Sequence, residues 1–238
     1  MKIEVLFPEV ANLSGDLMNI RYLKQCCAEI EVVETSLKSR PAFLDEEVAL
    51  VYMGTATESG LKLIGEALRP YLTEIRARID VGQRILLTGN AMDIFGSFID
   101  SDQAPRMEGL GILPIHTQYH MMKRHNSFFL GSYDNMSIVG FKSVFGHTYP
   151  EREGVPALFR TVRGVGRSGG QQDEGYRMNN LMATSLTGPL LVLNPPFTKS
   201  LLRQLGASSD ALAFEDAAME AYRVRVAEFS DEHRDPMY

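Results

Sequence analysis

Four segments carry polar and glycine residues directly after apolar runs, which is where an α/β protein keeps its reactive groups. They span residues 7–19, 53–58, 87–96 and 184–195. Ligands of open α/β sheets bind beyond the carboxyl ends of the strands, so we expect these segments to meet at one pocket. The side chains and glycines that could form its wall are Asn12, Asp16, Asn19, Gly54, Thr55, Asn90, Asp93 and Gly188.

Hydroxyl and carboxylate groups in these segments invite comparison with a hydrolase. Ser185 and Thr187 could meet Asp16 and Asp93 in the pocket. A hydroxyl nucleophile needs an adjacent base, and none of the four segments contains a histidine. We therefore interpret these residues as pocket-lining or helix-capping groups.

The elements that must position these segments alternate along the first half of the chain. Apolar runs predict strands at 3–7, 48–53 and 84–88, and an alternating pattern predicts another at 31–37. Helical spacing of apolar residues predicts helices over 16–23 and from an N-cap at Thr57 to Gly82. This order predicts a three-layer α/β/α fold with a mainly parallel central sheet.

The second half of the chain has a different texture. We predict an antiparallel, loop-rich region here. It contains short β-like runs at 127–133 and 137–141, separated by turn residues, and a glycine-rich stretch at 164–175. An apolar run at 190–193 precedes a predicted helix at 198–205. A last helix, about 208–230, should bury Met219, Tyr222, Val226 and Phe229. With no repeat or linker, we expect residues 1–238 to form a single domain on which this helix packs.

Charge and composition exclude several classes of protein. The 238 residues contain 24 Lys and Arg against 30 Asp and Glu, a formal net charge of -6, which disfavours nucleic-acid binding. The two cysteines, Cys26 and Cys27, are adjacent and do not form a disulfide framework. The chain has no apolar run of about 20 residues and opens without a signal-peptide pattern. We therefore expect a cytoplasmic protein with no membrane span.

The first and last of these segments also carry family motifs. Residues 6–19 read Leu-Phe-Pro-Glu…Asn-Leu-Ser-Gly-Asp-Leu-Met-Asn, and residues 184–195 read Thr-x-x-Thr-Gly-Pro-x-Leu-x-x-Asn-Pro. They resemble the opening and closing motifs of class I glutamine amidotransferase domains of the CobB/CobQ type, most closely the glutaminase subunit of lipid II isoglutaminyl synthase. Segments 109–112 and 140–148, the latter containing His147, also match this family in order.

This resemblance implies a fold and a biological setting. The fold would be flavodoxin-like, and the pocket, with His147 as a further candidate residue, would accept a glutamine-like small molecule. The partner would be a Mur-ligase-like subunit that supplies an activated carboxylate for amidation of peptidoglycan lipid II.

The departures from the family motif concern its two catalytic residues. The family carries its nucleophile in a Cys-Gly-Gly-x-Gln elbow; aligning the terminal glycine of that elbow on Gly96 places the cysteine at Gly89, and the catalytic histidine falls on Thr187. Amide hydrolysis by this route needs both a thiolate and an imidazole. Glycine would retain the strained turn of a nucleophile elbow without its strain. The resemblance therefore implies a catalytically degenerate member that acts as a structural or regulatory subunit or as a binding protein.

Two alternatives remain open. One is an active glutamine amidotransferase or ligase subunit, of the isoglutaminyl synthase or cobyric acid synthase type, with altered chemistry at Asn90, Asp93 or Thr187. The other is a stand-alone small-molecule sensor.

No cofactor or metal is expected. Residues 164–169 spell G-x-G-x-x-G, but the following residues are polar and broken instead of opening the helix that a dinucleotide site requires. His116, His120 and His125 lack an acidic third ligand nearby, so we interpret them as solvated.

Overall fold

A six-stranded sheet forms the centre of the protein in the computed structural model, which describes residues 1–168 and 173–238. Its strand order is β13-β14-β4-β3-β1-β2. The strands are β1 (Lys2–Leu6), β2 (Glu31–Thr35), β3 (Leu50–Met53), β4 (Ile85–Leu87), β13 (Tyr176–Met178) and β14 (Leu181–Ala183). Every neighbouring pair is parallel except β13 and β14 at one edge. The prediction of a mainly parallel sheet is confirmed.

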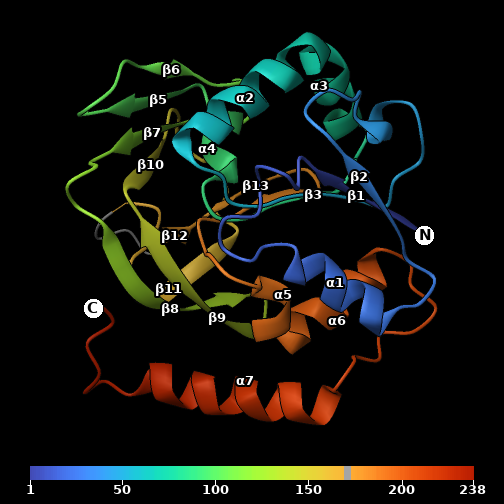
Figure 1. The fold of residues 1–238 in the computed structure, drawn as a ribbon. Coiled ribbons are helices and arrows are strands. Elements are labelled where there is room, and N and C mark those ends of the chain that lie inside the picture. The colour runs from blue at the N-terminus through green and yellow to red at the C-terminus, as the bar shows by residue number, and fades with distance from the viewer. Residues whose placement is uncertain (169–172) are drawn as a thin grey trace.

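Helices cover both faces of this sheet, which confirms the three-layer α/β/α arrangement (Figure 1). On one face lie α2 (Glu58–Leu68), α3 (Leu72–Asp80) and α4 (Ala91–Phe95), and on the other lie α1 (Met18–Cys26), α5 (Leu190–Leu193) and α6 (Pro195–Gln204). Side chains along β3 point alternately to the two faces of the sheet, so the strand packs against both helix layers. Val51 and Met53 pack with the first group of helices, while Leu50 and Tyr52 pack with the second.

The long helix expected after Thr57 is divided. Thr57 caps α2 by accepting a hydrogen bond from Gly60 N at 3.1 Å, as predicted. The 3-10 turn η2 (Arg69–Tyr71) then separates α2 from α3. Pro70 lacks the N–H that a continuous α-helix needs, and its ring clashes with the carbonyl four residues earlier. The continuous helix was therefore a wrong prediction.

Two further four-stranded sheets form the second half of the chain. One, in the order β10-β7-β5-β6, contains β5 (Phe98–Ser101), β6 (Met107–Glu108), β7 (Ile115–Tyr119) and β10 (Gly146–Pro150). The other, in the order β12-β11-β8-β9, contains β8 (His125–Tyr133), β9 (Met136–Val144), β11 (Phe159–Arg163) and β12 (Asp173–Glu174). Only β5 and β7 pair in parallel, so the predicted antiparallel character holds. Part of the glycine-rich stretch, residues 169–172, lies outside the described residues.

The C-terminal helix α7 (Glu215–Ser230) begins later than the predicted Ser208. Phe214, just before it, has a left-handed φ of 55°, and the Glu215 carboxylate accepts a hydrogen bond from Leu212 N at 3.1 Å. These features end the preceding loop and start the helix. Phe229 is buried and stacks on Phe128 with ring centroids 4.4 Å apart. Tyr222 and Val226 are half-buried in the same cluster, and Met219 is also half-buried.

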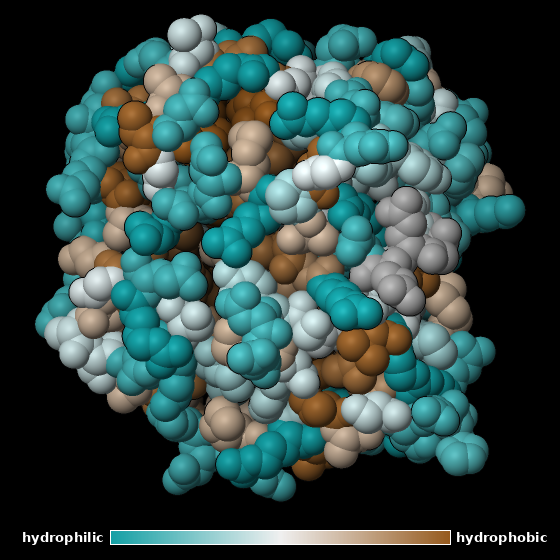
Figure 2. All heavy atoms as spheres, turned by 180° about the vertical axis from the view of Figure 1, so that it is seen from behind, coloured by the Kyte–Doolittle hydropathy of each residue, from teal (hydrophilic) through white to brown (hydrophobic). Residues whose placement is uncertain are grey.

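One face of the molecule is seen in the space-filling view (Figure 2). On the side turned away in Figure 1, hydrophobic residues form small patches between hydrophilic ones (Figure 2). Within residues 1–168 and 173–238, no helix is long and apolar enough to cross a membrane.

Candidate functional site

A cavity of about 370 Å³ opens where the parallel strands β3, β4 and β14 end. All four segments singled out in the sequence contribute to its wall: Leu13 and Ser14, Thr55 to Glu58, Gly89, Asn90, Met92 and Asp93, and Ser185 and Thr187. The volume lies within the range of small-molecule sites. Carboxyl ends of parallel strands share one edge of a sheet, which is why segments so distant in sequence meet here.

The opposite wall comes from the antiparallel half of the chain. It includes Tyr119, Arg124, Ser143, Phe145, Thr148 and Arg167. Only the segment 140–148 among these carried a sequence signal, through its family resemblance. Tyr119 and Arg124 carried none, because nothing local to β7 or to the loop after it indicates a pocket.

The turn Thr88-Gly89-Asn90, hereafter the elbow, leads from β4 directly into α4. Gly89 has a left-handed φ of +62°, and its N–H donates to Leu186 O at 3.1 Å. A Cβ added to Gly89 would lie 2.1 Å from Thr55 Oγ1 and 3.0 Å from Thr55 Cβ. Real Cβ atoms do not tolerate such contacts, so a side chain at position 89 would force Thr55 out of the rotamer that it adopts here.

Thr55 is itself held in place by the buried Asp16. The Asp16 carboxylate accepts hydrogen bonds from Thr55 Oγ1 at 3.1 Å, Thr88 Oγ1 at 3.2 Å and Ser14 N at 3.0 Å. These bonds satisfy a carboxylate that is entirely buried. Asp16 therefore ties the loop after β1 to the two turns that form this end of the cavity.

Several other candidate residues support the site from behind its wall. Asn19 donates to Tyr52 Oη at 2.9 Å and accepts from Leu191 N at 2.8 Å, and Asn12 accepts from Leu17 N at 3.0 Å. A Cβ at Gly54 would lie 2.3 Å from Asp16 Cβ, so only glycine fits there. With Asp16 and Gly188, these residues lie outside the set that lines the cavity.

Asn90 and Thr187 do line the cavity, but their polar atoms are engaged with backbone. The Asn90 carboxamide accepts from Ala56 N at 3.0 Å and donates to Ala56 O at 2.8 Å. Thr187 Oγ1 donates to Phe141 O at 3.1 Å. Both side chains therefore fasten neighbouring loops to one another, which is a structural use of the groups that altered chemistry would need.

His147 faces away from the cavity. Its neighbours on β10, Gly146 and Thr148, line the wall, and successive side chains on a strand point to opposite faces. The His147 Nε2 lies 3.1 Å from His125 Nε2. Burial, with a further contribution from the charge of His125, lowers the pKa of His147 to about 4. The imidazole is thus neutral at pH 7 and directed to another histidine.

The remaining histidines and the cysteines also lie elsewhere. His116 stacks between Phe98 and Tyr149, with centroid distances of 4.9 and 5.5 Å. In the described part of the chain, no group of three or more His, Cys, Asp or Glu side chains could hold a metal ion. Cys26 Sγ accepts from Ala213 N at 3.3 Å, and burial raises the pKa of this thiol. Neither cysteine lines the cavity.

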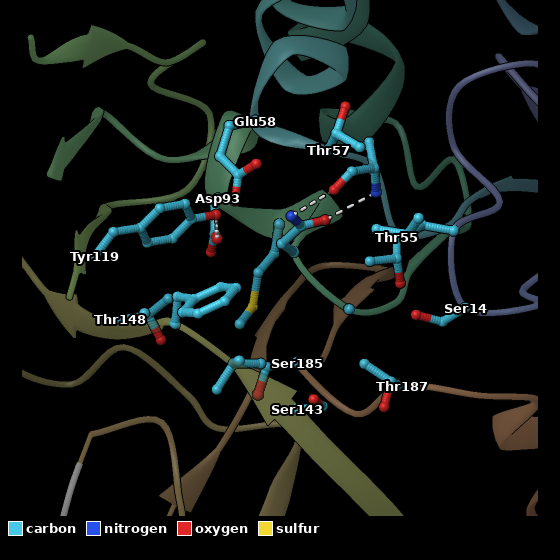
Figure 3. Close-up of a pocket in the computed structure, with 18 of the residues that line it drawn as sticks. Ser14, Thr55, Thr57, Glu58, Asp93, Tyr119, Ser143, Thr148, Ser185 and Thr187 are labelled. Carbon is cyan, nitrogen blue, oxygen red and sulfur yellow. Dashed lines mark hydrogen bonds between the residues drawn. The ribbon is translucent and has the colours of Figure 1, made fainter. Parts of the chain in front are cut away.

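Asp93 is a buried carboxylate on the side of the cavity away from Thr55, next to Tyr119 (Figure 3). Only 4% of it is exposed, and its carboxylate accepts from Thr117 Oγ1 at 3.0 Å and from Tyr119 Oη at 2.6 Å. Burial raises the pKa of Asp93 to about 7, because these two hydrogen bonds compensate only part of the lost hydration. Asp93 can therefore gain or lose a proton near neutral pH.

A buried ion pair supports the cavity beside Ser185. Lys142 Nζ and Glu174 Oε2 are 2.6 Å apart, and both side chains are at most 2% exposed. Glu174 also accepts from Ser185 N at 2.8 Å and Ser185 Oγ at 2.9 Å. Burial opposes ionisation of Glu174, but Lys142 and these donors outweigh it and hold the pKa of Glu174 below its usual value.

Known proteins resemble this chain both in sequence and in fold. No family model matches the chain. In sequence, it is 25% identical over 195 residues to the GatD subunit of lipid II isoglutaminyl synthase (glutamine-hydrolyzing) from Staphylococcus aureus strain N315, covering 81% of this chain and 79% of that protein.

Solved structures give the same fold. A crystal structure of a glutamine amidotransferase matches with a TM-score of 0.58 at 18% identity, covering 86% of this chain and 99% of that one. PurLQS from Thermotoga maritima matches with a TM-score of 0.57 at 13% identity, covering 94% and 97%. The chain therefore has a glutamine amidotransferase-like fold and is related in sequence to the GatD subunit of lipid II isoglutaminyl synthase.

Proposed function

We propose that this chain is a catalytically degenerate glutamine amidotransferase-like subunit of the CobB/CobQ type, which serves peptidoglycan lipid II amidation by binding and not by hydrolysing glutamine. The related Staphylococcus protein is a glutamine-hydrolysing subunit of a lipid II synthase, which supports the setting. The partner in this proposal is a Mur-ligase-like subunit.

One observation carries the proposal: Thr55 fills the space that a nucleophile at position 89 would occupy. Gly89 keeps the left-handed backbone of the elbow, yet Thr55 Oγ1 stands 2.1 Å from the place of its missing Cβ. The position matched to the family's histidine holds Thr187, whose hydroxyl is bonded to Phe141 O. The thiolate, the imidazole and the room for the thiolate are thus all missing, while the turn itself is preserved.

Ammonia release from glutamine tests the proposal directly. The purified chain, alone and mixed with a Mur-ligase-like protein, should release no ammonia above the buffer blank, while the Staphylococcus GatD subunit serves as positive control. Release that scales with the concentration of this chain would contradict the proposal and favour an active subunit with altered chemistry.

Restoring the family's residues tests the steric part of the argument. The double variant Gly89→Cys with Thr187→His should remain inactive, because Thr55 still occupies the space of the new side chain. Adding Thr55→Gly should allow the thiol to reach its position and produce measurable glutaminase activity. Equal activity in the double and triple variants would show that Thr55 does not block the elbow.

Association can be tested by co-purification. A tagged form of this chain should retain a Mur-ligase-like protein from the same organism through size-exclusion chromatography. A chain that elutes alone but whose melting temperature rises with small molecules would favour the alternative of a stand-alone sensor. The cavity of about 370 Å³ is the observation that favours this second candidate.

A further inference from the structure

In the described part of the chain, no cation directly contacts the Asp93 carboxylate, and Arg167, which also lines the cavity, is paired with Asp173. Asp93 is 4% exposed and bonded only to the neutral hydroxyls of Thr117 and Tyr119. Among the residues that the structure describes, no Lys, Arg or His forms an ion pair with it. A buried carboxylate ordinarily has a cation or several charge-assisted donors as partners.

A second carboxylate points into the same space. Glu58, the first residue of α2, lines the cavity, and Figure 3 shows its carboxylate directed toward the Tyr119 hydroxyl and Asp93. Its negative charge also contributes to the raised pKa of Tyr119, after burial and Asp93. The two acidic side chains therefore flank one region of the cavity.

Two aromatic rings near these carboxylates could also stabilise a bound cation. Tyr119 and Phe145 both line the cavity, and an aromatic face attracts a positive charge. Phe145 already receives Arg124, whose guanidinium carbon lies 4.4 Å from the ring centroid. Arg124 is exposed at the rim, where water screens its repulsion of a bound cation.

We propose that this end of the cavity binds the ammonium group of an amine-bearing small molecule, with Asp93 and Glu58 as its anionic partners. The ammonium would donate hydrogen bonds to the Asp93 carboxylate and lie beside the Tyr119 ring. The inference deepens the proposed function and rests on it in one respect, that the cavity retains its ligand instead of hydrolysing it. The ammonium would be an α-amino or a side-chain amino group, and not a carboxamide, which carries no charge.

Titration calorimetry with simple amines tests the site. Cadaverine carries ammonium groups alone, lysine adds a carboxylate that could meet Arg124, and glutarate carries only carboxylates. At pH 8 we expect saturable binding of cadaverine, lysine or both, and none of glutarate; stronger binding of lysine would indicate a zwitterionic ligand. Binding of glutarate without either amine would overturn the proposal, as would no binding of amines at millimolar concentration.

Variants and pH locate the binding. Asp93→Asn should weaken amine binding at least tenfold and Glu58→Gln about threefold by removing a nearby charge, while Glu66→Gln, an exposed residue of the same helix, should leave it unchanged. Unchanged affinity in Asp93→Asn would overturn the assignment. If that variant does not fold, the dependence of the wild-type amine affinity on pH tests the role of Asp93 instead.

The wild-type affinity should fall about tenfold from pH 8 to pH 6 as Asp93 is protonated. The titratable and charged groups around Asp93 are Tyr119 from β7, Lys142 from β9, Glu174 from β12, Glu58 from α2, and Arg124 and Arg167 from the cavity wall. Lys142 and Glu174 are paired with each other, which leaves Asp93 as the group that titrates in this window. An affinity that does not change with pH would contradict the role of Asp93.

Ammonia release measured on the same samples separates the two proposals. Amine binding together with glutamine hydrolysis would contradict the proposed function alone. Absence of both amine binding and hydrolysis would overturn this inference alone.

Discussion

The two ends of the cavity differ in how their polar groups are satisfied. At the elbow end, Thr55, Asn90 and Thr187 all direct their polar atoms to partners within the chain. At the other end, the buried Asp93 has only neutral hydroxyl donors, and its pKa is raised to about 7. A fully satisfied wall has little left to offer a ligand, whereas an under-compensated carboxylate has much to gain from one. The elbow side therefore holds its polar side chains in internal hydrogen bonds, and the under-compensated carboxylate of the cavity lies on the Asp93 side.

The strongest way to disturb both ends together is to break the ion pair that supports them. Lys142→Met should lower the free energy of unfolding by about 3 to 5 kcal/mol, because it leaves the Glu174 carboxylate buried without its cation. Urea unfolding measures this. Lys62→Met, at an exposed position of α2, is the control and should change little. Similar stabilities of the two variants would show that the pair does not support the cavity.

The elbow itself is tested by Gly89→Ala. We expect a loss of about 3 kcal/mol, from left-handed strain together with the contact to Thr55. Gly188→Ala separates the two causes, since Gly188 has a φ of +80° but no atom within 4 Å of its added Cβ, and it should lose only about 1 kcal/mol.

The contribution of Thr55 can be isolated by a double-mutant cycle. Thr55→Gly combined with Gly89→Ala should cost less than the sum of the single changes. Removing the Thr55 side chain relieves the clash that Gly89→Ala introduces. Additive losses in urea unfolding would refute the interlock of these two residues.

The opposite end is tested through its pH dependence. Asp93 has a folded-state pKa raised to about 7 from an ordinary value of 3.8, so its favourable contribution is complete below pH 3.8 and is lost as the pH rises to 7. Relative to Asp93→Asn, the wild type should therefore lose stability between pH 5 and pH 8. Chemical unfolding at the two pH values measures the difference. Asp80→Asn, exposed at the end of α3, should leave the wild-type pH dependence intact.

The smallest expected effect comes from a single hydroxyl. Tyr119→Phe removes the donor 2.6 Å from the Asp93 carboxylate and should cost about 1 kcal/mol at pH 8, where Asp93 is ionised. Tyr149→Phe, on the neighbouring strand β10 and outside the cavity, provides the control. A thermal unfolding shift that is equal in the two variants would argue against a specific role for the Tyr119 bond.

Local sequence patterns predicted the fold better than they predicted the site. Short apolar runs followed by polar loops predicted the parallel strands β1, β3 and β4, because a strand buried on both faces needs apolar residues throughout. The division of the helix after Thr57 at Pro70 and the late start of α7 were missed. In both places a backbone feature, the missing N–H of Pro70 or the left-handed Phe214, overrides helical spacing.

The site was predicted in part, and the limits are physical. The edge of the sheet where the segments meet follows from the parallel strands, but the direction of each side chain does not. Asp16 and Asn19 turned inward to bond the loops, and His147 turned to the far face of β10. Tyr119 reached the cavity from a strand that carried no signal. The sequence of a segment shows which polar side chains it carries. Which hydrogen-bond partner each side chain finds depends on the residues that pack around it.

The sequence by itself determined the alternation of strands and helices, the glycine at position 89 and the threonine at position 187. These follow from residue types and spacing, which are local. Only the tertiary structure decided that Thr55 occupies the space beside Gly89 and that Asp93 meets Thr117 and Tyr119 in a buried corner. Those contacts join turns and strands far apart in the chain, and both steric exclusion and desolvation act between neighbours in space.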